Sequence, residues 1–129
     1  MLFLLIFVNA LSKEDAEILR NVHESCIKET SVDPEIASKA IKGEYVDDEK
    51  LKEHLLCSNK KLGFIDDDGN IIEDVTVTKL VKHFPNEQLV RSAVQKCAIK
   101  QDTPVETAFQ FVKCMRSLAP KDMNLDSFF

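Results

Sequence analysis

The stretch EHLLCSNKKLGFIDDDGN, residues 53–70, joins a helix-like run containing a cysteine to an aspartate-rich turn. Three interpretations compete for it: the edge of a calcium loop, half of a zinc site, or one anchor of a disulfide. Each predicts a different class of protein, namely a sensor, a nucleic-acid binder or a secreted protein. The rest of the sequence has to choose between them.

The calcium interpretation fails on spacing. An EF-hand loop needs an acid at position 1, a glycine at position 6 and a bidentate acid at position 12. With Gly69 at position 6, positions 1 and 12 are Phe64 and Val75, which cannot ligate calcium. We therefore expect a solvated turn, capped by residues 66–68, in which Gly69 and Asn70 supply the positive φ.

Length and charge limit the possible functions. The chain has 129 residues, 44% of them hydrophobic and 30% charged, which is typical of one soluble globular domain. A net charge of −5 without a long basic cluster argues against nucleic acid and anionic membrane as partners. There is no nucleophile elbow, glycine-rich phosphate loop or HExxH motif, so we expect neither enzymatic activity nor a cofactor.

The first ten residues, MLFLLIFVNA, resemble part of a signal peptide. Residues 2–8 are uninterrupted apolar, and Val8 and Ala10 are small residues at the positions that signal peptidase reads. The run is too short to span a bilayer. We expect cleavage after Ala10 and a mature domain over residues 11–129; the alternative is a buried N-terminal strand or helical turn.

The four cysteines allow two kinds of cross-link. Secretion favours two disulfides among Cys26, Cys57, Cys97 and Cys114, and spacing alone leaves three pairings open. The alternative is a Cys2His2 zinc site, because His23 and His54 each precede a cysteine by three residues on a predicted helix. Zinc would leave the other two cysteines unpaired. As partly buried groups, His23, His54 and also His83 are candidate pH sensors, although most such histidines are simply packed or solvated.

Helix start and stop signals recur along the chain, and no segment reads convincingly as a strand. The β-branched segment 74–85 is ambiguous, and its helical neighbours make us predict a short helix there. We therefore predict one all-α domain of about six helices around an apolar cavity. The predicted starts and stops are Ser12, Asp33–Pro34 to Gly43, Asp47 or Asp48 to Gly63, 74–85, Asn86 onward, and Thr103–Pro104 to about Leu118.

The last predicted helix is apolar on most sides and should be central and buried. Periodicity alone favours two core faces, but one face could instead meet a ligand. The first stripe comprises Thr107, Phe111, Met115 and Leu118, and the second comprises Val105, Ala108, Phe109 and Val112.

The cysteine frame resembles that of the insect odorant- and pheromone-binding proteins. Those proteins usually have six cysteines, with three residues between the second and third and eight between the fifth and sixth. Here Glu53 and Val105 occupy the second and fifth positions, relative to Cys57 and Cys114. LGFIDDDGNI (62–71) is similar to the family's turn, and ETAFQFVKC (106–114) to its last-helix signature. The chain thus resembles the four-cysteine, "minus-C" branch.

The resemblance implies the pairings Cys26–Cys57 and Cys97–Cys114. It also implies that the bridge which relatives form between the third and sixth helices is missing here, so we expect a more pliable cavity wall and broader ligand tolerance at that contact.

The function implied by the resemblance is a secreted, non-enzymatic carrier of small hydrophobic molecules. It would act in sensillum lymph, haemolymph or a gland secretion, as a monomer or weak homodimer, with a chemosensory receptor as a further candidate partner. The tail tip, Phe128–Phe129, could fold over the cavity. The competing hypothesis is a secreted structural or interaction protein with a solid core. The expected ligand-binding residues are Leu55, Leu80, Leu89, Ala93, Thr107, Phe111, Met115 and Phe128.

Overall fold

The computed structural model describes residues 12–119, and within this range every regular element is an α-helix. The only strand-like pairing in this range is an isolated bridge between Ile65 and Ile71. The prediction of an all-α domain is confirmed. The helices are α2 (Lys13–Thr30), α3 (Pro34–Ile41), α4 (Glu49–Lys61), α5 (Glu73–Leu80), α6 (Glu87–Cys97) and α7 (Pro104–Leu118).

Most of the predicted start signals act as N-caps, with a side-chain oxygen that accepts a backbone N–H of the first turn. The cap of α4 is Asp48 rather than Asp47, with a distance of 2.9 Å from the Leu51 nitrogen to Asp48 Oδ2. Local sequence is therefore sufficient to place these helix starts. The other side-chain caps are Ser12, Asp33, Asn86 and Thr103.

Helix α5 is shorter than the predicted segment 74–85. It ends at Leu80, and the carbonyl oxygen of Leu80 accepts from the backbone nitrogens of His83 and Phe84, at 3.0 Å each, in the turn that follows. Phe84 is buried, so the turn is held against the core before Pro85 is reached. The helix thus ends before Pro85, in a turn whose Phe84 side chain packs into the core.

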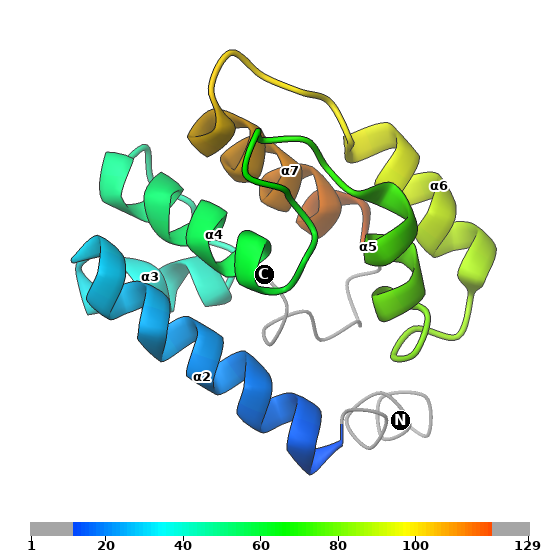
Figure 1. Cartoon of the computed structure of the whole chain (residues 1–129), viewed down its shortest axis with the longest axis horizontal. Helices are drawn as coiled ribbons and strands as arrows, with labels where there is room; N and C mark the ends of the chain where they lie inside the picture. The colour runs from blue at the N-terminus through cyan, green and yellow to red at the C-terminus, as the bar shows by residue number, and fades with distance from the viewer. Residues whose placement is uncertain (1–11, 120–129) are drawn as a thin grey trace.

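Helix α7 lies in the middle of the molecule, as predicted (Figure 1). It packs most extensively against α4 on one side and also contacts α6 on the other. Helix α2 covers the far side of α4, and α5 packs on α6. Phe111 and Val112 of α7 are completely buried, and burial of side chains of this size contributes about 1.5–3 kcal/mol each.

Two disulfides cross-link neighbouring helices, with the pairing that the resemblance implied. Cys26–Cys57 joins α2 to α4 with a Cα–Cα distance of 5.8 Å. Cys97–Cys114 joins α6 to α7 with a Cα–Cα distance of 5.5 Å. Because all four cysteines are used, the large α4–α7 contact carries no covalent link.

A cluster of charged groups lies across the α4–α7 contact instead. The Lys52 ammonium lies 2.9 Å from Glu106 Oε2 on α7 and 2.9 Å from Asp47 Oδ1 before α4. It also lies 5.1 Å from the ring centre of Phe109, and Lys113 approaches the same ring at 4.9 Å. Its two hydrogen-bonded carboxylates raise the pKa of Lys52 above the ordinary lysine range. We call these five residues the Lys52 clamp.

Candidate functional site: a cleft between helices α2, α3 and α4

The aspartate-rich segment forms a turn, as predicted. Asp66 Oδ1 accepts from the backbone nitrogens of Asp68 at 3.0 Å and Asn70 at 2.9 Å, and the Asn70 backbone hydrogen bond is the main cause of a lowered Asp66 pKa. Gly69 alone supplies the positive φ, +84°, and Asn70 does not share it. A Cβ on Gly69 would come within 3.0 Å of Pro104, so the turn packs closely on the start of α7.

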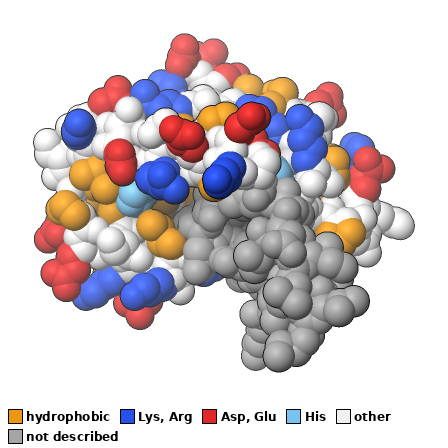
Figure 2. Space-filling model, turned by 90° about the horizontal axis from the view of Figure 1, so that it is seen from below, with side chains coloured by type: hydrophobic (Ala, Val, Ile, Leu, Met, Phe, Trp, Pro, Cys, Tyr) orange, Lys and Arg blue, Asp and Glu red, His pale blue; other side chains and the backbone are white. Residues whose placement is uncertain are grey.

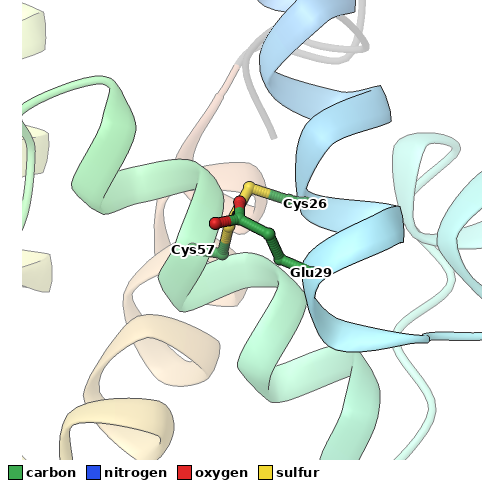
Figure 3. Close-up of side chains that lie close together, drawn as sticks. All are labelled: Cys26, Glu29 and Cys57. Atoms are coloured by element: carbon green, nitrogen blue, oxygen red, sulfur yellow. A yellow bond between two sulfur atoms is a disulfide. The ribbon is translucent and has the colours of Figure 1, made fainter.

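The zinc hypothesis is wrong for this site. It needs two thiolates, and Cys26 and Cys57 are joined to each other as a disulfide (Figure 3). The two helices do touch, which the zinc hypothesis required: the rings of His23 and His54 pack edge to face with their centres 5.1 Å apart. The two histidines therefore belong to a packed wall beside a disulfide.

Glu29 lies beside the same disulfide (Figure 3). Its Oε2 is 3.3 Å from Cys57 Sγ and 3.0 Å from the Lys61 ammonium. The two sulfurs and the carboxylate are spaced like metal ligands. Because neither sulfur carries a proton or a negative charge, the short distance from Glu29 to Cys57 is a contact and not a hydrogen bond, and Lys61 is the partner of this carboxylate.

Next to this disulfide, α2, α3 and α4 enclose a half-open cleft of about 310 Å³. This volume is at the small end of the range of ligand sites. On the face shown in Figure 2, hydrophobic side chains gather around a histidine on the left of the described surface. Apolar side chains form most of the cleft wall, among them Ala16, Leu19, Val22, Ala40, Leu55 and Leu62.

His23 and His54 also line this cleft. His54 is 3% exposed, and burial, followed by the neighbouring His23, lowers its pKa to about 4. A hydrogen bond with the Cys26 backbone opposes this shift. Burial likewise lowers the pKa of His23, against the opposing charge of Glu24. Both imidazoles are therefore neutral at neutral pH, and the cleft wall carries no histidine charge there.

Asn59 is a polar residue of the cleft wall that sequence reasoning missed. It is 2% exposed, and its Nδ2 donates to the Leu55 carbonyl oxygen at 2.8 Å. The signal was present, because Asn59 lies four residues after Leu55 and three before Leu62, on the apolar side of α4. A polar residue at such a position on a buried face is worth noting in any sequence.

The predicted ligand-binding residues are not gathered in one place. Leu55 lines the cleft. Leu89 is 42% exposed, Ala93 is half-buried, and Phe128 lies outside the described residues. Thr107 is fully buried, and its hydroxyl oxygen accepts a hydrogen bond from the Gln101 backbone nitrogen at 2.8 Å, so this hydroxyl has a structural role. The others, Leu80, Phe111 and Met115, are buried in the core. Their contact with a ligand stays a prediction.

The third histidine, His83, lies away from this cleft. Its Nε2 is 3.5 Å from Asp15 Oδ2, and its side chain is 11% exposed. It connects the turn after α5 to the first turn of α2. The predicted signal segment, residues 1–10, lies outside the described residues. Within residues 12–119, no helix combines the length and the apolar character needed to cross a membrane.

Within the described residues, the architecture is a set of helices cross-linked by two disulfides around an apolar core, with a cleft in the wall. Residues 8–117 match the model of the PBP/GOBP family. The chain belongs to this family, and its four cysteines in two disulfides fit the four-cysteine branch.

Relatives and solved structures agree with this assignment. The B1 protein of Tenebrio molitor is 37% identical over 114 residues, covering 88% of each chain. The fatty acid binding protein OBP56a from the oral disk of the blowfly Phormia regina is 28% identical, with a TM-score of 0.70 over 84% of this chain and 94% of that one. Odorant Binding Protein 7 from Anopheles gambiae, which has four disulfide bridges and was solved in complex with an azo compound, shares the fold at 22% identity, with a TM-score of 0.67 over 83% of this chain and 87% of that one.

The positions of the missing bridge can be tested directly. Glu53 and Val105 lie on the two helices of the α4–α7 contact, where Glu53 directly follows Lys52 and Val105 directly precedes Glu106. We expect Glu53→Cys plus Val105→Cys to form a third disulfide and to slow amide hydrogen exchange over residues 50–57 by about tenfold. This effect is smaller than loop-closure entropy alone would give, because engineered disulfides usually stabilise less than that model predicts. The range of bound ligands should narrow. A disulfide that forms without changing exchange or ligand range would show that this contact is already rigid.

Proposed function

We propose that this chain is a secreted carrier that binds small hydrophobic ligands without covalent chemistry. The observation that carries the proposal is the half-open apolar cleft between α2, α3 and α4, which the Cys26–Cys57 disulfide holds beside the core. Removal of apolar ligand surface from water, at about 25 cal/mol per Å², would drive binding. A largely apolar wall whose two histidines are neutral at neutral pH suits such ligands.

The comparisons support a binding role. The blowfly protein is named for fatty acid binding, and the mosquito protein was solved with a small compound bound. The family and fold are those of binding proteins, which supports a non-enzymatic role for this chain. Two disulfides are typical of proteins that mature in an oxidising compartment, which supports secretion into sensillum lymph, haemolymph or a gland fluid.

Saturable binding of a fluorescent hydrophobic probe tests the carrier function. We expect N-phenyl-1-naphthylamine to bind with one-site saturation and to be displaced by octanol. Ala16→Phe should weaken probe binding by about tenfold, because Ala16 is half-buried in the cleft wall and the added ring would fill part of the volume. Fluorescence titration at fixed protein concentration measures both effects.

The matched control places the same substitution at another half-buried alanine. Ala98, at the end of α6, does not line this cleft, so Ala98→Phe should leave probe affinity within twofold of the original. Absence of saturable binding in the unmodified protein would contradict the carrier function and favour a secreted helical protein with a solid core. Equal weakening by both variants would place the ligand elsewhere.

A further inference from the structure

Two polar atoms in the cleft wall lack a hydrogen-bond partner. They are His54 Nδ1 and Asn59 Oδ1, both inaccessible to solvent on residues that are 3% and 2% exposed. Buried polar atoms are almost always paired, and an unpaired one costs about 1–3 kcal/mol. Both residues line the same cleft. Because both unpaired atoms belong to residues that line the cleft, they point to a ligand in the cleft that supplies a hydrogen-bond donor.

The chemistry of His54 Nδ1 follows from the other ring nitrogen. The hydrogen bond between His54 and the Cys26 backbone acts to raise the pKa of the imidazole. A ring N–H that donates to a backbone carbonyl oxygen has this effect, because it stabilises the charged form of the ring. With Nδ1 unpartnered, that donor is Nε2. A neutral imidazole carries one proton, so Nδ1 is left with a lone pair and can only accept.

Asn59 gives the same answer independently. The Asn59 Nδ2 group donates to the Leu55 carbonyl oxygen at 2.8 Å, which fixes the orientation of the amide. The amide oxygen, Oδ1, is then the atom that lacks a partner. An amide oxygen has no proton, so it too can only accept. Two side chains of the cleft wall thus carry buried acceptor atoms, and no described residue donates a hydrogen bond to either; a ligand reaches them only if the wall gives way slightly.

We propose that this cleft selects an apolar ligand that carries an O–H donor, such as a medium-chain alcohol, over ethers and carboxylates of the same length. The inference rests on the proposed carrier function and names its ligand class. The hydroxyl donates to His54 Nδ1 or Asn59 Oδ1 while the alkyl chain packs on the wall formed by Leu19, Leu55 and Leu62. An ether cannot donate, and a carboxylate brings negative charge to two acceptors.

Arg20 is the one cation in the lining, and it could in principle attract a carboxylate. Its side chain is exposed at the rim, where water screens the attraction to an anion. The buried acceptors act in a region of low dielectric, where an unpaired group is costly. We therefore expect the buried acceptors, and not Arg20, to determine selectivity.

Competition between matched ligands tests this selectivity. At pH 8, 1-octanol should displace N-phenyl-1-naphthylamine with an affinity about tenfold higher than methyl octyl ether, the ratio expected for one net hydrogen bond to a buried acceptor. Octanoate should bind at least as weakly as the ether. In the His54→Phe plus Asn59→Leu variant the alcohol-to-ether ratio should fall to about one, while the affinity for the ether stays the same or rises.

His83→Phe is the matched control, because it removes a largely buried histidine that does not line this cleft, and it should leave the alcohol-to-ether ratio unchanged. Equal binding of alcohol and ether by the original protein would overturn the proposed selectivity and leave the carrier function intact. This result is expected if bound water already satisfies both acceptors. Failure of the probe and of all three ligands to bind would overturn the carrier function and this inference together.

Discussion

Cys26→Ala together with Cys57→Ala is expected to lower the free energy of unfolding by about 3.7 kcal/mol. The two cysteines are 31 residues apart, and this value is the loop-closure entropy of the chain-entropy model at that separation. Small domains are stable by only about 5–15 kcal/mol, so the loss is a large part of the total. Alanine is preferred to serine because Cys26 is completely buried and a hydroxyl there would need a partner.

The second disulfide supplies the comparison for this measurement. Cys97 and Cys114 are 17 residues apart, so their removal should cost about 3.1 kcal/mol in the same model, slightly less than the first pair. Urea denaturation of both double variants at pH 7 would measure these losses. A loss below about 1 kcal/mol for the first pair, with an unchanged dependence on urea, would show that packing alone holds α2 to α4.

Acid should destabilise the protein through His54, with a loss of about 2 kcal/mol between pH 8 and pH 5 and about 3 kcal/mol by pH 4. The folded-state pKa of about 4 is below the ordinary value of 6.5, so the unfolded chain binds a proton first as pH falls. The stability is therefore fully present above pH 6.5 and is lost as pH falls toward 4. His23 contributes in the same direction, since its pKa is also lowered.

Unfolding free energies of the original protein and of His54→Phe at pH 8 and pH 5 would measure this effect. The variant should lose most of the difference between the two pH values, whatever its absolute stability. The carboxylates with lowered pKa, Asp47, Asp66 and Glu106, have ordinary pKa values of 3.8, 3.8 and 4.5, so the stability they contribute is lost mainly below about pH 5 and masks little of the difference between pH 8 and pH 5. A His54→Phe variant that is as acid-sensitive as the original protein would contradict the assignment to His54.

Local signals predicted the helices well because a cap needs only its own turn. The side chains of Asp48 and Thr103 each accept a backbone N–H three residues later, so three or four residues of sequence are enough to identify such a cap. The disulfide pairing needed the family resemblance, since spacing left three choices open. The β-branched segment was correctly predicted as helix, but the helix ends at Leu80, earlier than the predicted segment, and is followed by a turn that contains the buried Phe84.

The candidate site was harder to predict, because a cleft depends on how three helices cross and not on any one of them. The apolar stripe on the last helix led us to predict Phe111 and Met115 as ligand-binding residues, but both side chains lie in the core of the described residues. The cleft lies on the other side of α4, between α2 and α3. Of the seven expected ligand residues within residues 12–119, only Leu55 lines the cleft. Asn59, which carries one of the two unpaired acceptors, looked like an ordinary polar residue near a helix end.

The Lys52 clamp lies across the α4–α7 contact, next to Glu53 and Val105, where the resemblance to six-cysteine proteins implies a missing bridge. A disulfide holds its two helices in any salt concentration, whereas ions screen a charge pair, and the screening length falls from about 10 Å at 0.1 M salt to about 3 Å at 1 M. The α4–α7 contact thus combines a buried apolar core with a charge cluster whose strength depends on the surrounding fluid. We therefore expect the stiffness of this contact to fall as the salt concentration of the medium rises.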